Sequence, residues 1–161
     1  MMTWANFFAA AAGASASLAG LVFVALSVNI NRILAFRQLP SRAAATIGTL
    51  MLILICSMAT LIPQPALNLG IEILVFSVCG WALKAWSAYR AIVDGARTQR
   101  PVREALTETL LGQIQVLPFL AGGVLLIRGD ASGFYWVAGG MLTVFVFSVF
   151  NGWVLLVEIL R

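Results

Sequence analysis

A few polar side chains that lie inside long apolar runs are the residues in this chain that could do chemistry. They are a carboxylate, an amine and three amides: Glu72, Lys84, Gln113, Gln115 and Asn151. A polar group inside a membrane costs several kcal/mol without a partner, so each is a candidate functional residue. Glu72 would suit proton binding or ion attraction. Its ordinary interpretation is an interfacial carboxylate that contacts water or a backbone donor. Lys84 is expected to snorkel to the interface, about 18 Å along the helix from Glu72.

The amides have a structural interpretation. Gln113 and Gln115 are two residues apart, so they point to different helix faces, and we expect interhelical hydrogen bonds. Asn29, Asn31 and Asn151 are expected to form one polar cluster that joins the first and last membrane spans.

The composition argues against catalysis. The chain has no histidine, which removes imidazole metal and haem ligation and histidine acid–base chemistry. Cys56 and Cys79 fall inside apolar runs, and we expect two buried small hydrophobic side chains with no zinc or redox motif. Neither a nucleophile with a base nor a phosphate-binding glycine loop occurs. We therefore expect no enzymatic activity, no cofactor and no metal.

The bulk composition indicates an integral membrane protein. Of the 161 residues, 61% are hydrophobic and only 10% are charged, whereas soluble domains carry about 25% charged residues. The net charge is +4. Because the cations gather between apolar runs, they indicate a cytoplasmic face and basic loops that suit anionic lipid headgroups, not nucleic acid.

The apolar runs predict an all-α helical bundle that forms one transmembrane domain over residues 1–161. The five expected spans cover about residues 7–30, 43–62, 69–91, 105–127 and 134–160. The alternative is four spans plus a re-entrant segment, because Gln113, Gln115 and Pro118 interrupt the fourth run.

Basic residues predict the orientation of these spans. Most arginines lie in the first and third connections. Because basic connections stay in the cytoplasm, we expect a protein of the inner membrane with its N-terminus outside and its C-terminus on the cytoplasmic side. Trp4 and Phe134 belong to aromatic groups at the starts of the first and fifth spans, where an interfacial anchor is expected.

The first span, Phe7–Asn31, carries a stripe that recurs every three or four positions, so its members share one helix face. The stripe consists of Gly13, Ser17, Gly20, Val24, Ser27 and Asn31. Small residues let another helix backbone approach closely in lipid. Three partners stay open: the other spans of this chain, a second chain, or the water of a pore.

Three stretches of the first half resemble a known group of proteins. The runs ASLAGLVFVALSVNINRIL, LPSRAAATI and LIPQPALNLGIEIL resemble small multi-pass bacterial inner-membrane proteins of unassigned function. Some members are automatically labelled as modulators of a membrane-bound AAA protease. The resemblance implies a bacterial cytoplasmic membrane and assigns no functional residue.

Two functions follow from the stripe. The first is a non-enzymatic homo-oligomeric scaffold, or an accessory subunit of a larger membrane complex, that packs through the first helix. The alternative is a homo-oligomeric ion channel whose pore is lined by the first helix, with Val24 as the constriction.

Overall fold

A computed structural model describes residues 2–28, 30, 39–96 and 112–153 of the chain. These residues form five α-helices: α1 (Met2–Val28), α3 (Leu39–Leu61), α4 (Ala66–Ala96), α6 (Leu117–Ile127) and α7 (Gly133–Trp153). No strand occurs in the described ranges. The all-α prediction is therefore confirmed.

Four of the helices are long and apolar enough to cross a membrane. Their apolar segments are Trp4–Val28, Ala43–Leu61, Ala66–Trp86 and Gly133–Trp153. The expected spans agree with these helices to within about five residues where the ranges are described. The fourth expected span is different, because its first part lies outside the described residues and its helix is interrupted. A shorter apolar helical stretch, Gly112–Ile127, stands in its place.

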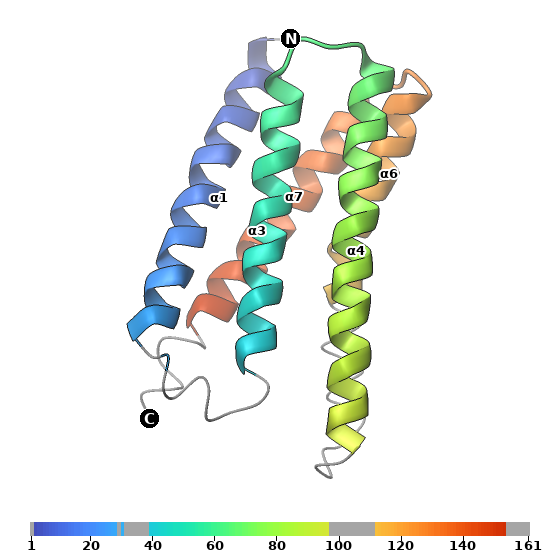
Figure 1. Ribbon diagram of the computed structural model, residues 1–161. Coiled ribbons are helices and arrows are strands. Elements are labelled where there is room, and N and C mark those ends of the chain that lie inside the picture. Colours follow the sequence, from blue (N-terminus) through green and yellow to red (C-terminus); the bar gives the residue numbers. More distant parts are fainter. Residues whose placement is uncertain (1, 29, 31–38, 97–111, 154–161) are drawn as a thin grey trace.

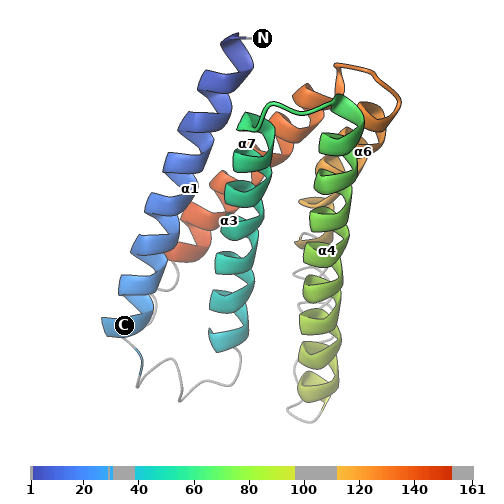
Figure 2. The ribbon, with the colours of Figure 1, turned by 45° about the horizontal axis from the view of Figure 1, so that its top comes forward.

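The helices run alternately up and down (Figure 1). α1, α3 and α4 follow one another along the bundle, α6 packs on α4, and α7 crosses behind to contact α6, α3 and α1. The rotated view in Figure 2 shows the same succession. α1 and α7 begin at the same end of the bundle, since the Trp4 ring stacks on Phe134 with centroids 5.7 Å apart. The two aromatic groups that the sequence placed on one side thus form one cluster.

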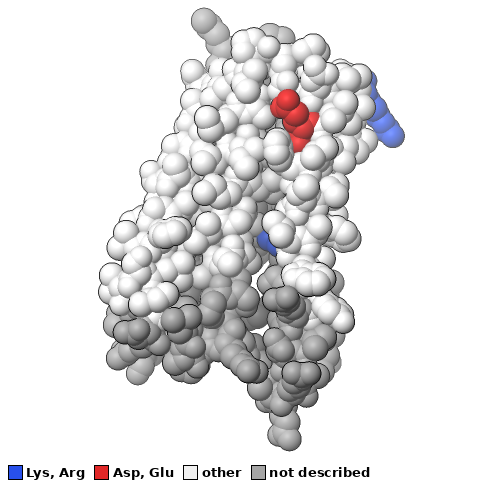
Figure 3. All heavy atoms as spheres, viewed as in Figure 1, with Lys and Arg blue, Asp and Glu red and all other residues white. Residues whose placement is uncertain are grey.

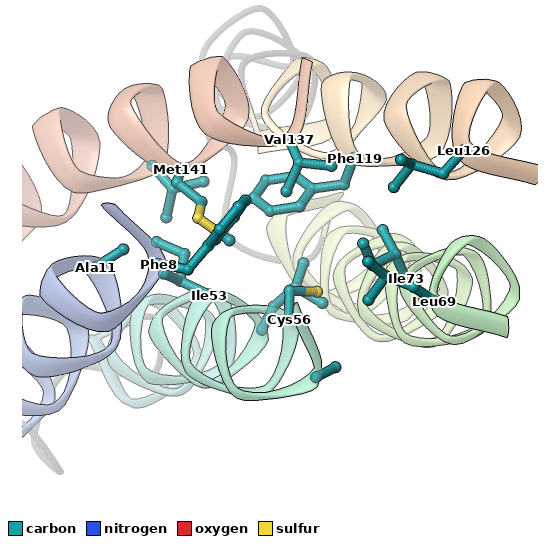
Figure 4. Close-up of a cluster of buried hydrophobic side chains, with 13 residues drawn as sticks. Phe8, Ala11, Ile53, Cys56, Leu69, Ile73, Phe119, Leu126, Val137 and Met141 are labelled. Carbon is teal, nitrogen blue, oxygen red and sulfur yellow. The ribbon is translucent and has the colours of Figure 1, made fainter. Parts of the chain in front are cut away.

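One cluster of buried apolar side chains joins all five helices (Figure 4). Phe8 of α1, Ile53 of α3, Ile73 of α4, Phe119 of α6 and Met141 of α7 are each fully buried in it. Lipid is as apolar as these side chains, so the cluster holds the helices together through close van der Waals packing. The short helix α6 is consequently part of the core.

Glycines bring α4, α6 and α7 into backbone contact. A Cβ placed on Gly122 would lie 2.8 Å from the carbonyl oxygen of Gly133 in α7. A Cβ on the next residue, Gly123, would lie 3.2 Å from the carbonyl oxygen of Gly70 in α4. Gly122 therefore allows close contact with α7 and Gly123 allows close contact with α4, so α6 packs closely against both helices.

A tight turn connects α6 to α7. Gly129 has a positive φ of 78°, which only glycine adopts without strain. The N–H of Gly129 donates to Leu126 O and the N–H of Asp130 donates to Leu125 O, both at 3.0 Å, which satisfies the last carbonyls of α6. The Asp130 carboxylate accepts from the backbone N–H of Ser132 at 2.8 Å, and this bond holds the pKa of Asp130 below its ordinary value.

Candidate packing face and intramembrane polar contacts

The small-residue stripe of α1 faces away from the rest of the chain. α1 turns Phe8, Ala11, Val22 and Ala25 into the bundle. The described stripe residues are all exposed instead: Gly13, Ser17, Gly20, Val24 and Ser27. Asn31, the sixth member, lies outside the described residues. Packing of this stripe against other spans of the same chain, one of the three open partners, is therefore wrong for its described members.

The exposed face of α1 changes character along the helix. Its first half exposes only small side chains over the range 9–20: Ala9, Ala10, Gly13, Ala14, Ala16, Ser17 and Gly20. A Cβ added at Gly13 or Gly20 meets nothing within 4 Å. From Leu21 onward the face becomes bulky, with Leu21 and Phe23 each 63% exposed. The surface that admits a close neighbour is thus residues 9–20, which we call the small-residue face.

The serine hydroxyls of the stripe are bonded to their own helix. Ser17 Oγ donates to the carbonyl of Gly13 and Ser27 Oγ donates to the carbonyl of Phe23, each at 2.9 Å. Each hydroxyl proton is thereby used within the helix, whereas the hydroxyl oxygen keeps lone pairs that accept further hydrogen bonds.

Glu72 is half-buried near the start of α4 and has a side-chain partner. Its Oε2 accepts from Gln64 Nε2 at 2.8 Å, and the same nitrogen donates to Ala59 O at 3.1 Å. This amide is a side-chain donor, which the sequence did not predict for Glu72. Sequence reasoning missed Gln64, although a glutamine between Pro63 and Pro65 is a polar signal at the end of α3.

Lys84 turns toward the segment that precedes α6. Its Nζ donates to Gly112 O at 3.0 Å and to Gln115 Oε1 at 2.9 Å. These two oxygens are partners that the sequence did not predict, and the expectation that Lys84 snorkels to the interface stays a prediction. Lys84 also makes no contact with Glu72, as the sequence spacing requires.

An interrupted helix explains why a carbonyl is available to Lys84. In a continuous helix the N–H of Val116 would donate to Gly112 O, but it donates to Gln113 O at 3.1 Å. The break precedes Pro118, which lacks an N–H and clashes with a regular helical turn. The ammonium of Lys84 takes the carbonyl that the break releases.

The three amides have different partners. Gln115 is 8% exposed and joins α4 through Lys84, so its predicted interhelical hydrogen bond is confirmed. Gln113 Oε1 is buried and accepts no hydrogen bond in the described part of the chain. Asn151 Nδ2 lies 3.4 Å from Thr46 Oγ1 of α3. The predicted cluster with Asn29 and Asn31 lies outside the described residues.

Among the residues that the structure describes, no group of three acidic, cysteine or histidine side chains lies close enough together to hold a metal ion. Cys56 is buried in the core as expected, whereas Cys79 is exposed on α4 and the expectation of burial is wrong there. Charged side chains are also sparse on the described part of the face that Figure 3 shows.

Comparison of this chain with protein-family models, curated proteins and solved structures finds no match. The resemblance to small bacterial inner-membrane proteins stays a prediction.

Proposed function

We propose that this chain is a non-enzymatic, multi-pass protein of the bacterial inner membrane that acts as an oligomeric scaffold or accessory subunit. Copies of the chain pack against each other through the small-residue face of α1. The observation that carries this proposal is the exposure of that face, with open space around Gly13 and Gly20.

A second copy of the same chain is the partner that fits best. A smooth face of Ala, Gly and Ser is complementary to itself, because each backbone can approach the other where no long side chain intervenes. The chain uses the same device internally, where Gly122 and Gly133 let α6 and α7 meet at backbone distance. The hydroxyl of Ser17 donates to Gly13 O of its own helix, so a dry contact between two copies leaves no unpaired donor there.

Five crossings are the topology that we propose. α1 and α7 start at the same end, so an odd number of passes separates them, and α3, α4 and the stretch that contains α6 would supply three. The stretch Gly112–Ile127 rises about 24 Å at 1.5 Å per residue, most of a hydrocarbon core of about 30 Å. The external N-terminus follows from the arginines of the first and third connections.

The mass of the purified protein after gentle detergent extraction tests the assembly. We expect the wild type to form particles that are multiples of the 17.2 kDa chain. Gly13→Leu with Gly20→Leu should shift these particles to monomers, since leucines prevent close helix approach. Gly139→Leu is the matched control because Gly139 of α7 is equally open, and it should leave the assembly intact.

A strictly monomeric wild type would contradict the proposal, as would a double variant with an unaltered particle mass. Planar-bilayer recording separates the scaffold from the channel. We expect no current from the wild type; a current altered by Ser27→Leu and by Val24→Ser would assign α1 to a pore lining instead.

A further inference from the structure

The ammonium of Lys84 has partners for two of its three donors among the residues that the structure describes. Its two hydrogen bonds both go to neutral oxygens, Gly112 O and Gln115 Oε1. A lysine ammonium carries three N–H donors, and among the described residues neither the third donor nor the positive charge has a partner. A half-buried charge without an opposite charge is costly, which favours an anionic partner at this position.

The surroundings of Lys84 place it at the level of a membrane interface. Lys84 lies in the second half of the apolar segment Ala66–Trp86 of α4. Trp81, Trp86 and Tyr89 are exposed on the same helix, and such aromatic residues mark the headgroup level of a bilayer. Phosphates of lipid headgroups lie at this depth in either leaflet, so Lys84 would lie near them in either orientation of the chain.

The surface next to this part of α4 is hollowed. Figure 3 shows a hollow between α3 and α4, with a basic side chain at its inner end. Of the basic side chains that are described, Lys84 is the half-buried one, whereas Arg128 is exposed in the turn after α6. Leu83, beside Lys84 in the chain, is 70% exposed and offers apolar surface to an acyl chain.

We propose that Lys84 binds the phosphate of an anionic lipid headgroup in this hollow. The third N–H of the ammonium donates to a phosphate oxygen, and the lipid charge compensates the lysine. Gly112 O and Gln115 Oε1 hold the ammonium in place, so these two groups act as positioning residues for the lipid site. The helix break before Pro118 thereby has a role in lipid recognition, because it frees the carbonyl of Gly112.

Native mass spectrometry with equal amounts of phosphatidylglycerol and phosphatidylcholine tests the lipid site. We expect the wild type to retain one phosphatidylglycerol as collision energy rises, with about a fivefold preference over phosphatidylcholine, the value expected for one lysine near an anionic headgroup. Lys84→Gln keeps an N–H donor for Gly112 and removes the charge, so the preference should disappear. Lys84→Arg keeps the charge and should retain the preference.

Arg128→Gln is the control for general surface charge and should bind phosphatidylglycerol as the wild type does. An equal loss of preference in Arg128→Gln and Lys84→Gln would overturn the proposal, as would an unchanged preference in Lys84→Gln. Displacement of the bound lipid by equimolar inorganic phosphate would also overturn it, because the site would then take free phosphate.

Discussion

Single residues decide where this chain turns, and Gly129 is the clearest case. Its positive φ of 78° lets the N–H groups of Gly129 and Asp130 close the last turn of α6. The same geometry places the Asp130 carboxylate under the N–H of Ser132 at the start of α7. One backbone conformation thus ends one helix and orients the next.

Gly129→Ala should destabilise the protein by about 1 kcal/mol, because a side chain at a left-handed position strains the backbone. The added Cβ meets nothing within 4 Å, so the loss reports the backbone alone. Thermal unfolding in detergent micelles measures the effect. Gly139→Ala adds a methyl to an equally open glycine without a positive φ, and it should cause no loss. Equal melting temperatures for the two variants would contradict the prediction.

At the scale of helices, small residues have two different uses in this chain. Gly122, Gly123 and Gly140 are buried where α6 meets α4 and α7. The small residues of α1 face outward instead. Both sets have the same composition, and only the packing distinguishes a contact within the chain from a surface offered to another copy.

Gly122→Ala should destabilise the folded chain by about 1–3 kcal/mol, the usual cost of overpacking a close contact. The new Cβ would lie 2.5 Å from Val137 Cγ2 and 2.8 Å from Gly133 O, and the second neighbour is backbone that can move only if α6 and α7 separate. Denaturant titration of the monomer in micelles measures the loss. Gly20→Ala, with open space around its Cβ, should leave monomer stability unchanged. A comparable loss of stability in Gly20→Ala would contradict the assignment of Gly122 to a close helix contact and of Gly20 to an exposed face.

At the scale of the whole molecule, the direction of each helix bears on how many times the chain crosses the membrane. The turn after α3 and the turn after α6 lie at the end of the bundle where α1 begins (Figure 1). A chain that crosses five times has both of these turns on one side of the membrane. A re-entrant fourth segment would place them on opposite sides.

Ala66→Cys and Ala131→Cys, each in a chain with Cys56→Ala and Cys79→Ala, test this topology. Both positions are exposed. A membrane-impermeant maleimide should label both in intact spheroplasts, because five crossings with an external N-terminus put both turns outside. Labelling of one position and protection of the other would contradict five crossings. Protection of both until lysis would reverse the proposed orientation.

The sequence predicted the helices well because apolar length and composition are local properties. Runs around α1, α3, α4 and α7 are long enough to span a bilayer whatever their neighbours are, and the predicted boundaries agree closely. The interruption before Pro118 was visible as a polar, proline-containing region. The partner of Lys84 could not be predicted from the sequence, because the carbonyl of Gly112 becomes available only where the regular hydrogen bonding of the helix is interrupted.

The sequence by itself predicted helices that are long and apolar enough to cross a membrane, with a stripe of small residues on the first of them. Spacing places Gly13, Ser17 and Gly20 on one face, but spacing carries no information about what lies opposite that face. Tertiary structure decided that this face is exposed, that Gly122 and Gly123 are buried at contacts between helices, and that Gln115 contacts Lys84. The physical reason is that these contacts join helices distant in the sequence, and their geometry depends on how all five helices pack.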